Sequence, residues 1–174
     1  KADYQQQATD AAESQFEMLK KLELSLSDFE ELKARCEEQG VDFLSTPFDL
    51  VTIDMLVDLG VDKWKLPSGE LTNLLYLRKI GALKQEVILS TGMANVDEVS
   101  AAVSVLESSG VRREQLTLLH CNSEYPTPMH DVNLRAMQTL ESAFPGLKGV
   151  GYSDHTLGIE VPIAAVAMGA SVIE

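Results

Sequence analysis

Residues that can bind anions or move protons follow six short apolar segments of the sequence. They stand at Ser45-Thr46-Pro47, Lys65-Leu66-Pro67-Ser68-Gly69-Glu70, Ser90-Thr91-Gly92-Met93, Cys121-Asn122-Ser123, Ser153-Asp154-His155-Thr156 and Glu174. Serine and threonine hydroxyls, one lysine and nearby glycine N–H groups are suited to holding a phosphorylated substrate. Each hydroxyl alone is also typical of helix caps and turns, so the repetition is what favours a binding site.

Lys65 and His155 are the ionisable residues whose setting is least typical of a surface. Lys65 lies in the apolar segment 63–66, where a lysine is rare unless it is paired or binds an anion. The alternative is a strand-end lysine that reaches solvent or pairs with Glu70. His155 can act as an acid or base or bind a divalent metal, with Asp154 available to orient its ring.

The other two histidines are weaker candidates for a site. His120 lies inside the apolar segment 116–121 and fits a packed, hydrogen-bonded core residue as well as any other role. His130 lies in a proline-rich loop, so we expect its side chain to be exposed. A single histidine does not hold a metal ion by itself.

Alternating strands and helices must position these residues. Strands are predicted to start near residues 42, 63, 87, 116, 149 and 171, and helices to span residues 13–23, 27–40, 50–59, 72–80, 95–109, 133–144 and 160–168. The helix 27–40 is predicted to begin with a capping box formed by Ser27 and Glu30. It is predicted to end at Gly40. This alternation predicts one α/β domain with a parallel sheet, in which ligands bind at the carboxyl ends of the strands.

Composition limits the classes of partner. The chain has 174 residues and a formal net charge of −13, which argues against nucleic acid or an anionic membrane surface as the main partner. No apolar run approaches the ~20 residues of a membrane span, and no leader sequence is evident. Cys36 and Cys121 form no CxxC pair, so we expect no disulfide and a cytoplasmic location.

Several motifs together resemble the bacterial sialic acid synthase family. They are Phe43-Leu44-Ser45-Thr46-Pro47-Phe48, the segments 65–70 and 89–93, Leu118-Leu119-His120-Cys121 followed by Tyr125-Pro126-Thr127-Pro128, and Ser153-Asp154-His155-Thr156. The resemblance covers nearly the whole chain and implies a (β/α)8 TIM barrel. Residues 1–174 would then form a partial barrel, about strands three to eight, without the first two strands, the last helix and the family's antifreeze-like domain.

The resemblance implies a transferase that condenses phosphoenolpyruvate with an open-chain, N-acylated mannosamine and releases phosphate. The product would be a nonulosonic acid, either sialic or legionaminic. The sugar is left open among N-acetylmannosamine, its 6-phosphate and a diacetamido-trideoxy hexose. A divalent metal, Mn²⁺ or else Mg²⁺, and a homodimer in the full-length protein are also implied. We expect the isolated 174 residues to be inactive.

The resemblance also assigns roles to residues. Glu70 would be catalytic, His155 would bind the metal, and Tyr125 would contact the sugar. The other predicted substrate contacts are Thr46, Lys65, Ser68, Ser90, Asn122, Ser123 and Ser153. The chain departs from the family's motifs at two places. Pro67 removes one N–H donor beside the expected phosphate site. Asn122-Ser123 stands where other members have Thr-Asn, so either Asn122 or Ser123 can be the phosphate contact.

The family's second metal histidine would follow Glu174 and is not in the chain. Two alternatives stay open. One is another phosphoenolpyruvate-using sugar-acid synthase, and the other is a non-catalytic phosphate-binding half-barrel.

Overall fold

The computed structural model describes residues 5–6, 9–10 and 12–174. The chain divides into two compact units, of which one ends at Phe43 and the other spans Leu44–Glu174, where the sequence predicts one domain. All the secondary structure that carries the site belongs to the second unit.

The first unit contains two capped helices, α2 (Gln15–Lys20) and α3 (Leu26–Gln39). The predicted capping box of α3 is wrong by two residues. Ser25 is the N-cap, because its Oγ accepts a hydrogen bond from the Asp28 N–H while the Asp28 carboxylate accepts one from the Ser25 N–H. The C-terminal end at Gly40 is confirmed, and its φ of 67° suits glycine.

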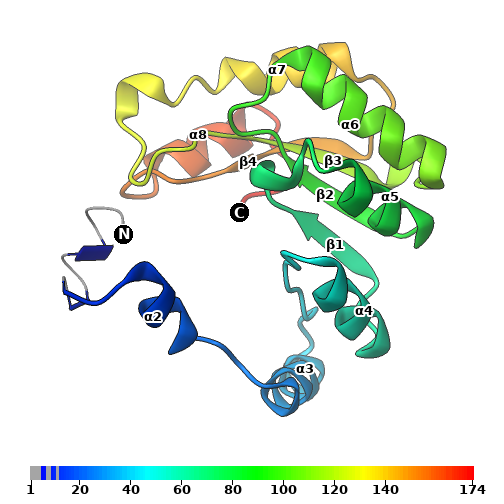
Figure 1. Ribbon diagram of the computed structural model, residues 1–174. Helices are drawn as coiled ribbons and strands as arrows, with labels where there is room; N and C mark the ends of the chain where they lie inside the picture. The colour runs from blue at the N-terminus through cyan, green and yellow to red at the C-terminus, as the bar shows by residue number, and fades with distance from the viewer. Residues whose placement is uncertain (1–4, 7–8, 11) are drawn as a thin grey trace. The chain divides into compact units, whose positions relative to one another are not determined.

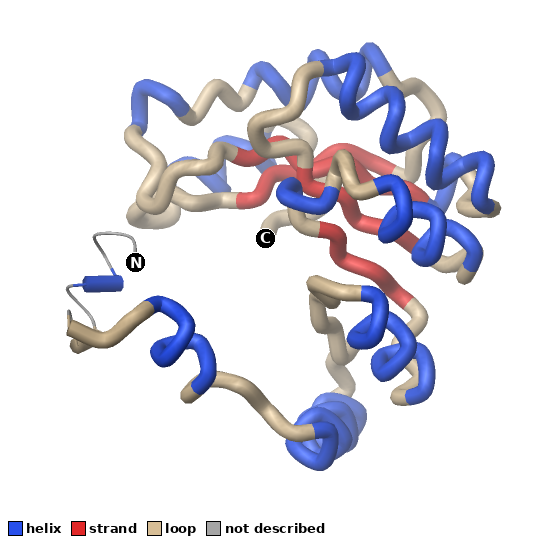
Figure 2. The backbone as a smooth tube through the Cα atoms, in the orientation of Figure 1, coloured by secondary structure: helices blue, strands red, loops and turns tan. Residues whose placement is uncertain are grey.

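The second unit is built on a parallel four-stranded sheet. Its strands are β1 (Lys63–Leu66), β2 (Glu86–Ser90), β3 (Leu116–Cys121) and β4 (Gly149–Ser153), paired in the order β1-β2-β3-β4 (Figures 1 and 2). Because consecutive strands are neighbours and all are parallel, the sheet has the arrangement of a barrel wall and its carboxyl ends meet at one edge.

Two of the predicted strands are not formed as expected. Residues 41–48 contain no strand, since extended backbone becomes a strand only when a neighbouring strand pairs with it, and these residues make no ladder. The predicted strand near 171 is reduced to one bridge between Tyr152 and Ile173. A backbone hydrogen bond lengthens this pairing with β4 by one residue, because the Glu174 N–H donates to the Tyr152 carbonyl at 3.0 Å. This pairing places Glu174 at the same edge as the four strand ends.

Helices follow the strands and bury the outer face of the sheet. They are α4 (Leu50–Asp58), α5 (Leu74–Ala82), α6 (Val96–Ser109), α7 (Arg135–Ala143) and α8 (Glu160–Ala167), with short 3₁₀ turns η1 (Ser68–Glu70), η2 (Arg113–Gln115) and η3 (Met129–Asp131) (Figure 1). Asp49, Asn73 and Asn95 cap α4, α5 and α6 through their side chains. The largest fully buried side chains include Trp64, Leu66, Leu89 and Leu116 on the strands. This core holds the strand ends in place.

Two buried tyrosines lead to opposite stability predictions. Tyr152 is fully buried, and its hydroxyl has no hydrogen-bond partner among the described residues, whereas the Tyr76 hydroxyl donates to the Pro47 carbonyl at 2.8 Å. We expect Tyr152→Phe to leave the free energy of unfolding unchanged or to raise it by up to ~1 kcal/mol, because it removes an unsatisfied polar group. Tyr76→Phe should cost ~1 kcal/mol. Urea unfolding of both variants at neutral pH is the measurement.

Tyr152→Phe should also change how the stability depends on pH. Burial, with the Asp154 carboxylate, raises the pKa of Tyr152 from 10.0 to about 12, so its neutral form stabilises the fold below pH 10 and that contribution is lost as the pH rises to about 12. Tyr152→Phe should therefore flatten the loss of stability over this range. An alkaline slope equal to that of the unsubstituted protein would contradict this assignment.

Candidate active site

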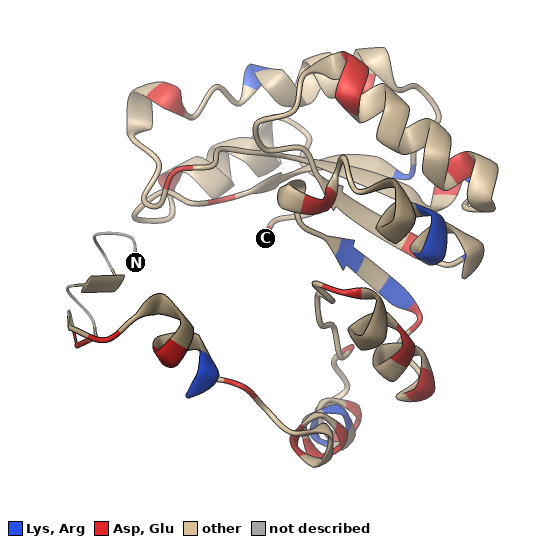
Figure 3. Cartoon of the chain, viewed as in Figure 1, with Lys and Arg blue, Asp and Glu red and all other residues tan. Residues whose placement is uncertain are grey.

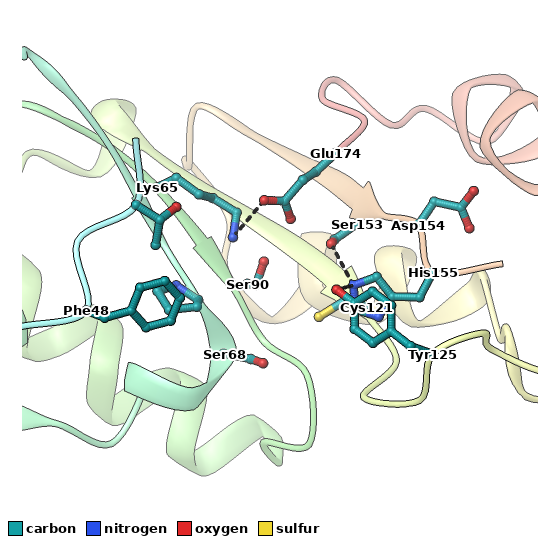
Figure 4. Close-up of a pocket in the computed structure, with 12 residues that line it drawn as sticks. Phe48, Lys65, Ser68, Ser90, Cys121, Tyr125, Ser153, Asp154, His155 and Glu174 are labelled. Carbon is teal, nitrogen blue, oxygen red and sulfur yellow. Dashed lines mark hydrogen bonds and ion pairs between the residues drawn. The ribbon is translucent and has the colours of Figure 1, made fainter. Parts of the chain in front are cut away.

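The carboxyl ends of the strands surround a pocket of about 390 Å³. Most of the predicted site residues line it, namely Thr46, Lys65, Ser68, Ser90, Tyr125, Ser153 and His155. The structure adds Phe48, Pro67, Cys121, Asp154 and Glu174 to the lining (Figure 4). Residues from segments far apart in the sequence thus meet because parallel strands end at one edge.

Lys65 is the buried cation of this pocket. It is 7% exposed, and its Nζ lies 3.0 Å from Glu174 Oε1 and 3.3 Å from the Leu66 carbonyl oxygen. The pairing with Glu70 considered from the sequence does not occur, because the Glu70 carboxylate instead accepts a hydrogen bond from Asn73 Nδ2. Figure 3 shows acidic residues spread over helices and loops while β1 carries lysines. Lys65 therefore places one buried cation in the pocket, beside the carboxylates of Asp154 and Glu174.

Two serines supply hydroxyls beside Lys65. Ser90 and Ser153 are buried, and Ser90 Oγ has no hydrogen-bond partner among the described residues. A buried hydroxyl without a partner is costly unless a ligand or water completes its bonding. The pocket therefore combines a cation with donors that suit a phosphate or carboxylate.

Gly92 holds Ser68 in position at the pocket. Its φ is 44°, and a Cβ at this position would lie 2.5 Å from Ser68 Cβ. We expect Gly92→Ala to displace Ser68 and to cost ~1–3 kcal/mol of unfolding free energy. If Ser68 makes the phosphate contact expected from the sequence, the KM for the expected substrate phosphoenolpyruvate should rise about tenfold, the worth of one ordinary hydrogen bond. Steady-state kinetics and thermal unfolding are the measurements.

Gly60 offers the matched control for that substitution. Its φ is 83° and nothing lies within 4 Å of its Cβ position, so Gly60→Ala adds backbone strain without a clash. It should lower stability and leave the KM unchanged. An equal change in KM for both variants would show that Ser68 is not involved.

Tyr125 and Ser153 orient the His155 ring. Tyr125 Oη lies 2.6 Å and Ser153 Oγ 3.4 Å from His155 Nε2, and the Tyr125 ring stacks on the imidazole with centroids 3.7 Å apart. The prediction that Asp154 orients His155 is wrong. Asp154 Oδ1 accepts hydrogen bonds from the N–H and hydroxyl of Thr156 instead, because the chain turns there. The ring orientation thus depends on a residue from another loop.

Burial favours the neutral form of His155. Desolvation lowers its pKa, against the opposing effects of the Asn122 backbone carbonyl and the Glu174 and Asp154 carboxylates. Neutral imidazole is the form that binds metals. Yet the described residues contain no group of three or more His, Cys, Asp or Glu side chains placed to hold a metal ion. His155 alone does not make a metal centre.

Three predicted site residues do not line the pocket. Glu70 is half-buried in η1, Asn122 Nδ2 donates to the Asp131 carbonyl at 2.7 Å, and Ser123 is exposed. At β3, alternation along the strand accounts for Asn122: Cys121 lines the pocket, so the residue after it faces the other way, and Ser123 lies beyond the end of the strand.

Sequence reasoning did not assign site roles to Glu174, Cys121 or Phe48. The position of Glu174 in the sequence could have indicated its role, because it stands at the end of the last apolar segment. Lys65 and Ser90 stand at the ends of two earlier apolar segments. Burial raises the pKa of the Cys121 thiol, which the Gly92 N–H and Lys65 oppose in part. Both cysteines are free, as predicted.

The other histidines lie outside the pocket. His120 is 9% exposed and its Nε2 bonds the Val132 carbonyl at 2.9 Å, so it is the packed, hydrogen-bonded core residue that the sequence left as one alternative. His130 is exposed, as predicted. Within the described ranges, no helix is both long and apolar enough to cross a bilayer.

The sequence matches the NeuB family over residues 1–174. The chain belongs to the NeuB family. It is 52% identical over 174 residues to the N,N'-diacetyllegionaminic acid synthase of Campylobacter jejuni, and 47% identical over 176 residues to that of Legionella pneumophila. All of this chain aligns in both cases, with 52% and 49% of the relatives. The chain thus spans about half the length of these NeuB relatives.

Solved structures agree with the NeuB assignment. The N-acetylneuraminic acid synthetase of Leptospira borgpetersenii, determined with citrate, superposes with a TM-score of 0.80 at 40% identity, over 87% of this chain and 52% of that one. A truncated 3-deoxy-D-arabino-heptulosonate 7-phosphate synthase from Thermotoga maritima gives a TM-score of 0.71 at 18% identity, over 87% of this chain and 59% of that one, which shows a shared fold alone. The predicted family and the α/β fold with a parallel sheet are confirmed.

Proposed function

We propose that this NeuB-family chain carries the phosphoenolpyruvate site of a nonulosonic acid synthase. The buried Lys65 at the carboxyl ends of the strands, beside the unpartnered Ser90 hydroxyl, supports this proposal most strongly. Phosphoenolpyruvate brings a phosphate and a carboxylate, and charge-assisted hydrogen bonds from Lys65 to either group would replace its ion pair with Glu174. The hydroxyls of Ser68, Ser90 and Ser153 would supply further donors.

In the proposed reaction, the methylene carbon of phosphoenolpyruvate bonds to the aldehyde carbon of the open-chain sugar. One water molecule balances the release of inorganic phosphate. The residues of this chain bind and orient phosphoenolpyruvate, while Tyr125 and Glu70 are the proposed sugar-side groups, with Glu70 able to orient hydroxyls or move a proton. A divalent cation, Mn²⁺ or Mg²⁺, would supply Lewis acidity toward the aldehyde. Its ligands beyond His155 would come from outside the described side chains.

The proposed sugar carries no phosphate. Of the described residues that line the pocket, only Lys65 bears a permanent positive charge, and phosphoenolpyruvate needs it. The names of the two bacterial relatives favour a diacetamido-trideoxy hexose, which leads to legionaminic acid. The proposal also includes a cytoplasmic enzyme that forms a homodimer.

The test is phosphate release by the protein at its full natural length, with phosphoenolpyruvate, Mn²⁺ and one sugar at a time. The sugars are the diacetamido-trideoxy hexose, N-acetylmannosamine and N-acetylmannosamine 6-phosphate, and mass spectrometry identifies the product. We expect the highest kcat/KM with the diacetamido sugar and the lowest with the 6-phosphate. Release only with arabinose 5-phosphate or erythrose 4-phosphate would instead identify a different sugar-acid synthase. Binding of phosphoenolpyruvate without turnover would identify a non-catalytic module.

A further inference from the structure

A second cavity, of about 350 Å³, is lined by residues that lie in or next to β2, β3, α6 and α7, and it is called the outer cavity below. Its polar lining residues are Thr91, His120, Asn133, Arg135 and Thr139. None of them lines the active-site pocket. Strand alternation explains the separation: Ser90 and Cys121 face the pocket, and their sequence neighbours Thr91 and His120 face the outer cavity.

The outer cavity favours an anion. Arg135 begins α7, and none of the described carboxylates forms an ion pair with it. No Asp or Glu side chain is among the described residues that line the cavity, although the chain has a net charge of −13. An arginine without a protein partner at the mouth of a cavity can bind a carboxylate with two hydrogen bonds.

Hydrogen-bonding groups accompany that charge. His120 is more than nine-tenths buried, and because the Val132 carbonyl accepts from Nε2, the neutral ring leaves Nδ1 as an acceptor. The Asn133 amide and the Thr139 hydroxyl add donors and acceptors. These groups suit a ligand with several hydroxyls.

Apolar side chains complete the lining. They are Ala94, Val96, Val99, Ala136 and Leu140. Small aliphatic groups of this kind accept the methyls of acyl groups, and no Phe, Tyr or Trp is among the described lining residues to stack on a nucleobase. The combination therefore matches an N-acylated sugar acid better than a nucleotide.

We propose that the outer cavity binds the nonulosonic acid product, with its carboxylate at Arg135, and that this binding slows the reaction. The inference rests on the proposed function, because that reaction supplies the product. The pocket and the outer cavity have similar volumes, about 390 and 350 Å³, so a molecule formed in one can be held in the other.

The turn Thr91–Gly92 connects the two cavities. Both residues line the outer cavity, and the backbone at Gly92 lies against Ser68 of the pocket. The Thr91 N–H and hydroxyl both donate to the Leu119 carbonyl, at 2.9 and 3.0 Å, so these bonds hold the turn on β3, and the Ala94 N–H donates to the Thr91 carbonyl at 2.9 Å within the turn. A ligand that shifts this turn from the outer side also shifts Ser68. The expected coupling is a fivefold or larger loss of phosphoenolpyruvate affinity, roughly the lower end of measured allosteric effects.

The test measures product binding directly by calorimetry, in a Lys65→Met background that weakens binding in the pocket. The protein is used at its full natural length, and the probe is N,N'-diacetyllegionaminic acid. We expect one binding event per chain in Lys65→Met and about tenfold weaker binding after adding Arg135→Gln, the loss of a charge-assisted hydrogen bond. Arg78→Gln is the matched control, because Arg78 is also an exposed helical arginine but does not line the cavity.

A second variant and the reaction kinetics complete the test. Ala136→Leu fills the outer cavity and should also abolish the binding event. In the otherwise unsubstituted enzyme, the acid should raise the KM for phosphoenolpyruvate at least fivefold, and Arg135→Gln should remove this effect without changing kcat/KM in the absence of the acid. Absence of binding in Lys65→Met, or equal binding with and without Arg135→Gln, would overturn the inference. Binding at Arg135 in a protein without synthase activity would overturn the proposed function alone.

Discussion

Substitution of Lys65 by methionine is expected to lower kcat/KM for phosphoenolpyruvate by about 10²–10⁴, the loss of two charge-assisted hydrogen bonds at ~1.5–3 kcal/mol each. Methionine has a similar volume, so the packing of β1 should survive. The side chain lost is the only permanent cation among the described lining residues of the pocket. The measurement is steady-state kinetics together with direct binding of phosphoenolpyruvate by calorimetry.

Lys79→Met provides the control for that result. Lys79 is also paired with a carboxylate, with its Nζ 2.6 Å from Asp54 Oδ2, but it lies on α5 outside the pocket. Its replacement should leave kcat/KM unchanged. A Lys65→Met enzyme that is folded by circular dichroism and within threefold of the original kcat/KM would show that the phosphate binds elsewhere.

The second large effect is expected for His155→Ala, which should lower kcat by about 10²–10³ and weaken Mn²⁺ binding by at least tenfold, as loss of a metal-ligating or orienting histidine does. The substitution removes the imidazole whose Nε2 lies 2.6 Å from Tyr125 Oη. Its effect on metal binding separates a ligand from a purely structural residue. Manganese paramagnetic resonance titration measures that binding independently of turnover.

His130→Ala and Tyr125→Phe are the companion variants. His130 is exposed and outside the pocket, so its loss should change neither kcat nor metal affinity. Tyr125→Phe keeps the stacked ring and removes the hydroxyl from Nε2, so it should change metal binding less than His155→Ala does. Unchanged Mn²⁺ affinity in His155→Ala would exclude the metal-binding role and leave His155 as an acid or base.

Local signals predicted the elements of the second unit because those signals are short in range. Strand starts near 63, 87, 116 and 149 and most of the helix ends lie within a few residues of the observed ones. Hydrophobic period and capping residues depend on neighbours within one turn. The prediction of a strand near residue 42 was wrong, because a strand also needs a neighbouring strand to pair with, and the local sequence does not specify that neighbour.

The sequence by itself determined which chemical groups stand at the strand ends and, through its motifs, the NeuB family. Covalent order is enough to place these groups after the apolar segments, and the resemblance of the motifs indicates the family. The tertiary structure decided which residue of each strand end faces the pocket, so that Cys121 lines it and Asn122 does not. It also decided that Lys65 pairs with Glu174 and that Tyr125 orients His155. Such contacts join segments far apart in the chain, and only the pairing and packing of the whole sheet sets their distances.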